Sequence, residues 1–451
     1  VPLLLIRRLE LGIYVLLGVA LLFEQFRIFG LENVLTYVAP IYLNLNLITG
    51  IGALVLNPVE IMLLAIVGAW FVRATVSRTW SVRSIRHLPI TAGFMAMLLF
   101  FAAYGIARGG ELTIALWEIR ALFYLCATYV VATQLIRTRS QVRVCIWIVI
   151  AMIGIKGLQG CWRYFITLNR DLTHIHAITG HEDALFIATA FLLMTAFFFF
   201  DYHRKEFVAL VLLFPTTFIT FILTQRRIAY GAFAMMLLIA FAVFPRLLKI
   251  RALKIAVPMI PVLMLYTAVF WNSGHVVAMP IRQVRSIFAE GEDEDRSNLY
   301  RKVELINLKQ TVRDHPFGVG FGRKYKIIVP LDDIDALFPL WDYIPHNCIY
   351  WMWAKTGFLG FIVFWLFFGT FTAQTVIDFR LLRDPYFKAV TLMVLGFLTG
   401  QLAVAYYDLQ ITFYRNMIYL GIAMALPAAM RTIEHNEDEL HRGDSNNAGQ
   451  N

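Results

Sequence analysis

Apolar runs of about 17–25 residues recur along almost the whole of this chain, and they restrict its fold more than any other feature. A run of this length crosses a hydrocarbon core of roughly 30 Å as a helix, which satisfies its own backbone polar groups. Apolar residues make up 59% of the 451 residues, more than a soluble domain needs for its core. The sequence therefore predicts an all-α, polytopic membrane protein.

The runs predict about twelve transmembrane helices with one long loop. The expected helices are 11–29, 58–76, 89–106, 113–136, 142–162, 183–201, 207–223, 228–244, 252–271, 348–376, 388–408 and 411–430. The chain is thus divided into helices one to nine at 1–271, a large loop at 272–345, helices ten to twelve at 346–430 and a tail at 431–451, predicted to be disordered. The segment 31–57 is apolar but rich in Pro, Gly and Asn, and we interpret it as interfacial or re-entrant, with a thirteenth crossing left open.

Lysine and arginine mark alternate connections between these predicted helices. The basic connections carry Arg7 and Arg8; Arg73, Arg78, Arg83 and Arg86; Arg137, Arg139 and Arg143; Arg204 and Lys205; Arg246, Lys249, Arg251 and Lys254; Arg380, Arg383 and Lys388; and Arg431 and Arg442. The positive-inside rule places this set in the cytoplasm, with both termini, and the long loop outside. The net charge of +10 is then largely a topology signal and does not indicate nucleic-acid binding, because the basic residues are spread over short loops.

Several arginines lie at the outer ends of the predicted helices, against that rule. Arg226 and Arg227 form a tight outer turn, and Arg120, Arg163 and Arg415 fall in the outer portions of their helices or just beyond. Arginines at this depth extend to lipid headgroups or face a polar cavity, and both interpretations stay open for Arg163 and Arg415. The outer arginines have no carboxylates in the same turns, so they favour an anionic ligand, and a lipid pyrophosphate has the right charge and depth.

The long loop adds candidates for the same ligand. Arg296 and Arg301 begin a stretch that is predicted to continue as an amphipathic helix to Val312. The acidic run 290–295 before it is interpreted as a solvated loop and not as a divalent-metal site. A second polar segment, with His174, His176, His181, Glu182 and Asp183, matches no zinc spacing. We expect it to line a cavity, with its last three residues as secondary candidates for a catalytic base.

Two motifs mark the end of the loop. The stretch Gly318-Val-Gly-Phe-Gly322, centred on Gly320, lacks the Lys-Ser/Thr ending of a P-loop, and it predicts a tight turn that is either structural or in contact with a ligand. His346 then precedes an apolar helix, with Asn347 in position to cap it. An imidazole at the water–lipid boundary can act as a general base. The structural alternative is an interfacial polar pair that begins the helix.

These motifs, in this order, resemble the O-antigen ligase and O-antigen polymerase (Wzy-type) family over roughly residues 205–375. The resemblance rests on the arginine that opens a helix after an outer turn, the loop arginine, the run Asp314-His-Pro-Phe-Gly-Val-Gly-Phe-Gly322, and His346-Asn before a helix containing Lys355-Thr-Gly-Phe-Leu-Gly360. By this resemblance the turn arginine is Arg227 and the loop arginine is Arg296. The chain departs from the family at Lys355, where relatives commonly carry an acidic residue.

The resemblance implies glycosyl transfer in a membrane fold of the GT-C kind. The glycan would move from undecaprenyl pyrophosphate to a glycan, the lipid A core or another acceptor, with inversion and without a metal or cofactor, on the periplasmic face of the bacterial inner membrane. A ligase and a polymerase both remain open, because the sequence carries no acceptor signature. The alternative from another class, a transporter of a lipid-linked or anionic solute, predicts internal repeats, which the helix pattern lacks.

Overall fold

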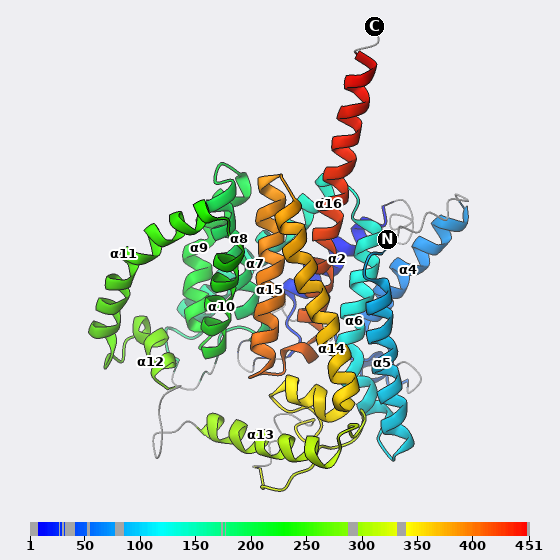
Figure 1. Cartoon of the computed structure of the whole chain (residues 1–451). Coiled ribbons are helices and arrows are strands. Elements are labelled where there is room, and N and C mark those ends of the chain that lie inside the picture. Colours follow the sequence, from blue (N-terminus) through cyan, green and yellow to red (C-terminus); the bar gives the residue numbers. More distant parts are fainter. Residues whose placement is uncertain are drawn as a thin grey trace.

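The described secondary structure is entirely helical (Figure 1). The computed structural model describes residues 8–26, 28, 31, 41–51, 55–76, 85–172, 175, 177–286, 296–331 and 340–448. Within them, ten helices are long and apolar enough to cross a membrane: α4 (Pro58–Val76), α5 (Leu88–Ala107), α6 (Leu112–Leu135), α7 (Arg139–Trp162), α8 (His181–Phe200), α9 (Lys205–Leu223), α11 (Arg246–Phe270), α14 (Cys348–Leu381), α15 (Pro385–Ala405) and α16 (Tyr414–Ala448). Two shorter apolar helices are α2 (Glu10–Leu22) and α10 (Arg227–Val243). The protein is an all-α, polytopic membrane protein.

Each of these twelve helices overlaps one of the twelve predicted spans, although α2 ends at Leu22 and its predicted span reached residue 29. The segment 31–57 contains only the short helix α3 (Leu45–Thr49) within its described residues. The tail was predicted to be disordered from residue 431, but α16 continues to Ala448. Its extension is anchored where Glu434 accepts hydrogen bonds from the backbone N–H groups of Arg383 and Asp384. These contacts connect segments that are far apart in sequence, so the composition of the tail could not reveal them.

The centre of the bundle is formed by α6, α8, α15 and α16. Helix α6 packs on α16, α7 on α9, and α15 on both α8 and α10. On α7, Gly157 and Gly160 face Thr217 and Thr220 of α9, and Oγ1 of Thr220 donates to the carbonyl of Gly157 at 2.8 Å. Small residues let two helices approach closely in a membrane, where lipid is as apolar as a helix surface. Helix α11 has no buried residue and stands apart from the bundle (Figure 1).

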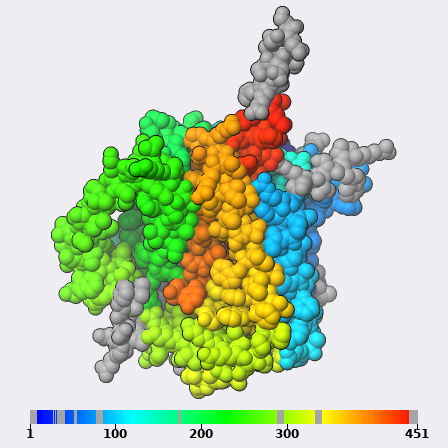
Figure 2. Space-filling model, in the orientation of Figure 1, coloured from blue at the N-terminus to red at the C-terminus, as the bar shows by residue number. Residues whose placement is uncertain are grey.

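The side of the bundle that carries residues 272–347, here called the loop side, is covered by short elements. After the 3₁₀ turn Val276–Ala278 comes α12 (Met279–Arg285), which contacts α9 and α10, and then α13 (Arg296–Asp314), which packs on α14. Helix α13 begins at the predicted arginine and ends two residues beyond the predicted end. Figure 2 shows this part of the chain as a layer across the loop side of the bundle.

The glycine-rich motif docks into a break in α14. At Gly357 the backbone leaves the helical region, with φ of 60°, so nearby carbonyls lose their helical partners. The N–H groups of Val319 and Gly320 donate to the carbonyls of Ala354 and Lys355, each at 2.9 Å. Backbone polar groups freed at membrane depth must find partners inside the protein, and the motif provides them. Two of the segments that carried the sequence resemblance, 314–322 and 355–360, thus form one structural unit.

Candidate active site

His346 lies on the loop side directly before α14, where Glu304 of α13 holds it. The backbone N–H of His346 donates to Oε2 of Glu304 at 2.9 Å, and Nδ1 of its ring lies 3.2 Å from Oε1. The side chain of Glu304 is buried, whereas that of His346 is 24% exposed. The ring of Tyr300, one turn earlier on α13, meets the imidazole edge-on with ring centroids 5.7 Å apart. The imidazole is therefore fixed at one nitrogen and still reachable from the loop side.

Asn347 caps the following helix, as predicted. Its Oδ1 accepts a hydrogen bond from the backbone N–H of Tyr350 at 3.0 Å, which satisfies one of the free donors of the first turn of α14. A capping contact of this kind fixes the direction in which the chain enters the helix. Asn347 therefore has a structural task next to His346, and a contact with substrate stays a prediction.

Arg226, directly before α10, belongs to a polar cluster with His181 and Asp408. Its guanidinium lies 2.5 Å from Nε2 of His181, and Nδ1 of His181 lies 3.9 Å from Asp408. Burial lowers the pKa of Arg226, while Asp408 raises this pKa and Arg301 lowers it again. Burial alone would raise the pKa of the Asp408 carboxyl, but His181, Arg226 and Arg301 hold this pKa well below its usual range. Two guanidiniums thus act on the Asp408 carboxylate, so basic side chains outnumber acidic ones among Arg226, Arg301 and Asp408. Glu182, which pairs with Arg415, also raises the pKa of Arg226.

Arg301 and Arg296 both lie on α13, in different surroundings. Arg301 is half-buried, and its Nε, like that of Arg226, is buried without a hydrogen-bond partner in the part of the chain that the structure describes. Arg296 is the first residue of the helix and is exposed. Buried donors are nearly always paired with protein, water or ligand atoms. The guanidiniums of Arg226 and Arg301 therefore have hydrogen-bond donors to offer to an anion.

Arg227, the first residue of α10, contacts the segment that leads to α13. Its guanidinium donates to Oγ of Ser286 at 3.2 Å, and the amide of Asn298 on α13 donates to the carbonyl of Ser286 at 3.3 Å. Arg296 lies two residues before Asn298. The predicted turn arginine and loop arginine thus belong to neighbouring elements, although a long stretch of sequence separates them.

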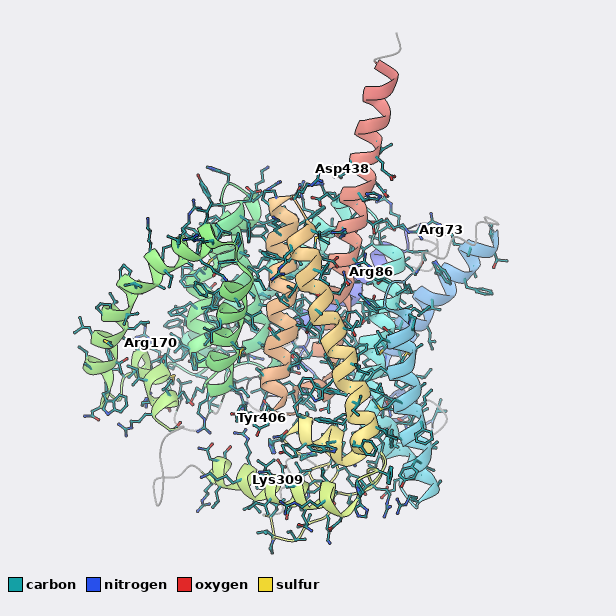
Figure 3. The ribbon with its side chains drawn as sticks, in the orientation of Figure 1. Arg73, Arg86, Arg170, Lys309, Tyr406 and Asp438 are labelled. Atoms are coloured by element: carbon teal, nitrogen blue, oxygen red, sulfur yellow. The ribbon has the colours of Figure 1, made fainter. Side chains whose placement is uncertain are left out.

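The arginine cluster and His346 lie on the same side of the bundle. Asp408 and Glu304 are both close enough to the thiol of Cys348 to interact with it electrostatically, and the 3₁₀ turn Gln410–Thr412 contacts α14. Figure 3 shows Tyr406, at the end of α15, and Lys309, on α13, at this side of the molecule. The site is therefore built from the ends of α9 and α15, the beginnings of α8, α10 and α14, and one face of α13.

Two secondary candidates are structural residues within a buried ionic network. Arg415 pairs with Asp183 at 2.6 Å and with Glu182 at 3.4 Å, and Lys156 lies 3.0 Å from Asp183. Each of these side chains is at most 3% exposed. Both carboxylates are engaged by buried cations, and this pairing does not support a role as base. His181 is half-exposed, and its Nε2 contacts the guanidinium of Arg226.

Arg163 and Arg415 do not extend to lipid headgroups. Arg163 binds Glu24 at 2.8 Å, and Glu24 also accepts a hydrogen bond from Lys156 at 2.8 Å. The network of Arg163, Arg415 and Lys156 with Glu24, Glu182 and Asp183 holds three basic and three acidic side chains. Intramembrane charges are stable when they are paired in this way. The interpretation that the two arginines face the polar interior is confirmed.

Arg120 does not join the candidate site. Its Nε lies 3.1 Å from Glu60, and its guanidinium donates to Asn44 at 2.6 Å. The expectation concerned carboxylates in the same turns, whereas the partner Glu60 lies on another helix, α4. His174, His176 and the acidic run 290–295 lie outside the described residues.

Gly320 is a packing residue. Its φ is +86°, and a Cβ at this position would come within 2.3 Å of Cα of Gly105 on α5. Of the two interpretations of the glycine motif, the structural turn is the one its surroundings support. Lys355 is fully buried and pairs with Glu118 at 2.5 Å, and Glu118 also accepts the N–H of Gly322. The lysine thus helps to hold the motif through Glu118.

Glu304 and Asp408 are site residues that the sequence did not reveal. Glu304 follows Arg296 and Arg301 on the predicted helix, so its spacing of three residues from Arg301 could have placed it on the same face. Asp408 was assigned to the end of a transmembrane helix, where an acidic residue is costly and therefore notable. Neither carboxylate could be connected with His346 or Arg226 before the fold was known.

Residues 189–365 match the family model described as O-antigen ligase. The matched segment runs from α8 into α14 and includes Arg226, Arg227, Arg296, Glu304 and His346. The resemblance inferred from the motifs is therefore confirmed over this segment. No curated protein matches the chain. The matched segment thus contains the arginines of the candidate site and His346, whereas His181 and Asp408 lie outside it.

Proposed function

We propose that this protein is an O-antigen ligase-type glycosyltransferase, which moves a glycan from undecaprenyl pyrophosphate to an acceptor hydroxyl. The observation that carries the proposal is the placement of His346, held by a buried carboxylate, on the same side of the bundle as an arginine cluster in which basic side chains outnumber acidic ones. Both belong largely to the O-antigen ligase segment. The reaction needs a group that stabilises the anionic leaving group, which the arginines would provide. It also needs a proton acceptor, which His346 would provide.

The loop side is assigned to the periplasm of a bacterial inner membrane, with both termini in the cytoplasm. Support comes from the alternating basic loops, which the positive-inside rule places in the cytoplasm, opposite the loop side. A polyprenyl pyrophosphate would have its headgroup at the level of the arginines, because its chain lies in the bilayer. The acceptor, a glycan or the lipid A core, would approach from the aqueous side.

In the proposed reaction the arginines bind the pyrophosphate and His346 accepts a proton. The acceptor hydroxyl gives its proton to the imidazole, its oxygen bonds to the anomeric carbon, and the bond from that carbon to the pyrophosphate oxygen breaks. Negative charge then builds on the pyrophosphate, where fixed guanidiniums in a water-poor site stabilise it. They supply the charge stabilisation that a metal provides elsewhere, and a single displacement inverts the anomeric centre.

His346→Gln tests the proposed base. The substitution keeps a hydrogen-bonding side chain but removes the proton acceptor, so turnover should fall by about 10²–10⁴-fold. Transfer is measured with purified protein, lipid-linked donor and acceptor, together with the amount of folded protein. His275→Gln is the control, because His275 is an exposed histidine on the same side. Wild-type turnover of His346→Gln would mean that the histidine only begins the helix.

Lipid-linked and surface glycans of a deletion strain distinguish the acceptors. Full-length chains that remain on the carrier lipid indicate a ligase, and single repeat units on the carrier indicate a polymerase. Purified protein that transfers no glycan but moves a lipid-linked or anionic solute across vesicles would indicate a transporter and would contradict the proposal.

A further inference from the structure

The buried face of α13 consists of residues that hold other parts of the chain. Its buried positions are Glu304, Asn307, Leu308 and Thr311, which are spaced as one face of a helix. Asn307 binds the backbone of Ile328 and Val329, and Thr311 accepts the backbone N–H of Lys326 at 2.9 Å. Asn307 and Thr311 thus fix the backbone of the loop. Glu304 differs from them, because it also binds a ring that can exchange a proton.

Glu304 offers a separate oxygen to each donor of His346. Oε2 accepts the backbone N–H, and Oε1 faces Nδ1 of the ring. No lysine or arginine in the described part of the chain forms a salt bridge with this carboxylate. A buried carboxylate is costly unless it accepts hydrogen bonds, so both contacts with His346 stabilise it. The Glu304 carboxylate thus has an acceptor oxygen for each of the two His346 nitrogen atoms that face it.

This geometry selects one form of the imidazole. An ionised carboxylate only accepts hydrogen bonds, so Nδ1 must carry the proton that points to Oε1. In the neutral ring the lone pair then lies on Nε2, the nitrogen on the far side of the ring from Glu304. When Nε2 takes up a proton, the imidazolium that forms still faces the carboxylate. Both the starting form and the product of proton transfer are favoured by the same contact.

We propose that Glu304 is a positioning residue that keeps His346 in the Nδ1–H form with Nε2 free to accept the proton of the acceptor hydroxyl. The inference rests on the proposed role of His346 as base. Glu304 itself neither binds substrate nor takes up the proton in this scheme. It acts by holding the ring and by stabilising its positive charge after transfer, as orienting carboxylates do beside other catalytic histidines.

Glu304→Gln is the decisive variant because its shape is unchanged. An amide can accept from the backbone N–H of His346 with its oxygen, but its NH₂ group then donates to Nδ1 and favours the opposite form, with the proton on Nε2. Turnover should fall by about 10–1,000-fold, less than the roughly 10⁴-fold loss known where such a carboxylate is changed to an amide in a serine protease. The KM for the donor should change little, because Glu304 does not contact it.

The form of the ring is measured directly from histidine ¹⁵N resonances at a pH where His346 is neutral. The spectrum of His346→Gln assigns the signal. In the wild type Nε2 should be unprotonated, and in Glu304→Gln it should be protonated. Thr311→Val is the matched control, since it removes a polar contact from the same helix face and should leave both the ring signal and kcat unchanged apart from losses explained by stability.

Two results would overturn the inference. One is wild-type turnover of Glu304→Gln with Nε2 still unprotonated. The other is a loss of turnover in Glu304→Gln that its lower thermal stability fully explains, with the same relation between turnover and stability in Thr311→Val. The base assignment fails separately, by wild-type turnover of His346→Gln. An inactive His346→Gln beside a fully active Glu304→Gln would reject the role of Glu304 alone.

Discussion

At the scale of residues, the adjacent arginines of the α9–α10 turn have different partners. Arg226 joins His181 and Asp408, whereas Arg227 contacts Ser286 on the way to α13. One turn thus directs two guanidiniums to two sides of the candidate site. A pyrophosphate has two phosphoryl groups, and forked guanidiniums match phosphate oxygens better than a point charge does.

Arg227→Ala and Arg296→Ala should each lower transfer by about 10–150-fold, the cost of roughly 1.5–3 kcal/mol for a lost charge-assisted contact. Arg227→Lys should recover little, because an ammonium offers no fork. The assay is transfer in vitro at several donor concentrations. Arg285→Ala is the control, since Arg285 is an exposed arginine of α12 that contacts Trp271 and Asn272. Full activity of both alanine variants would place the pyrophosphate elsewhere.

The sequence predicted the placement of these residues on the loop side more accurately than it predicted their partners. Arg226, Arg301 and His346 come together on the loop side, as residue type and position in the chain suggested. Arg120 and Arg415 have similar positions but bind Glu60 and the pair Glu182 and Asp183. Those carboxylates lie on other helices, and spacing along one helix cannot reveal a contact between two.

At the scale of elements, the break in α14 and the glycine motif depend on each other. Gly357 interrupts the helix, and the motif supplies donors to the carbonyls near the break. The motif also contacts α5, where Phe321 donates its N–H to the carbonyl of Phe101 at 3.1 Å. The sequence indicated a tight turn, but its docking into a broken helix required the fold. His346 precedes this helix, so the motif stabilises the element that follows the catalytic candidate.

Gly320→Ala should lower the free energy of unfolding by about 1–3 kcal/mol. The reason is that a Cβ meets the backbone of α5 and that the positive φ disfavours alanine. Thermal unfolding in detergent measures this as a lower Tm. Gly274→Ala is the control, since a Cβ there meets nothing within 4 Å. An unchanged Tm with lost transfer would instead indicate that Gly320 contacts a ligand.

At the scale of the whole molecule, the basic loops gather on one side. Arg86 and Arg431 both approach Asp378 at the end of α14, Arg139 binds Glu437 at 2.8 Å, and Arg383 lies 3.4 Å from Asp438. Alternation along the sequence predicted this grouping because helices that cross a bilayer reverse direction each time. The pattern could not predict the ion pairs, which join loops that are distant in the chain.

This grouping predicts the orientation of the whole molecule, and labelling tests the prediction. Ser273→Cys on the loop side should react with an impermeant maleimide on intact spheroplasts, whereas Ser140→Cys, beside Arg139, should react only after permeabilisation. Cys161 is replaced by Ala in the background, because the other native cysteines, Cys126, Cys145 and Cys348, are buried. Labelling of position 140 but not 273 on intact spheroplasts would reverse the orientation. The arginines and His346 would then face the cytoplasm, and a periplasmic transfer could not take place at this site.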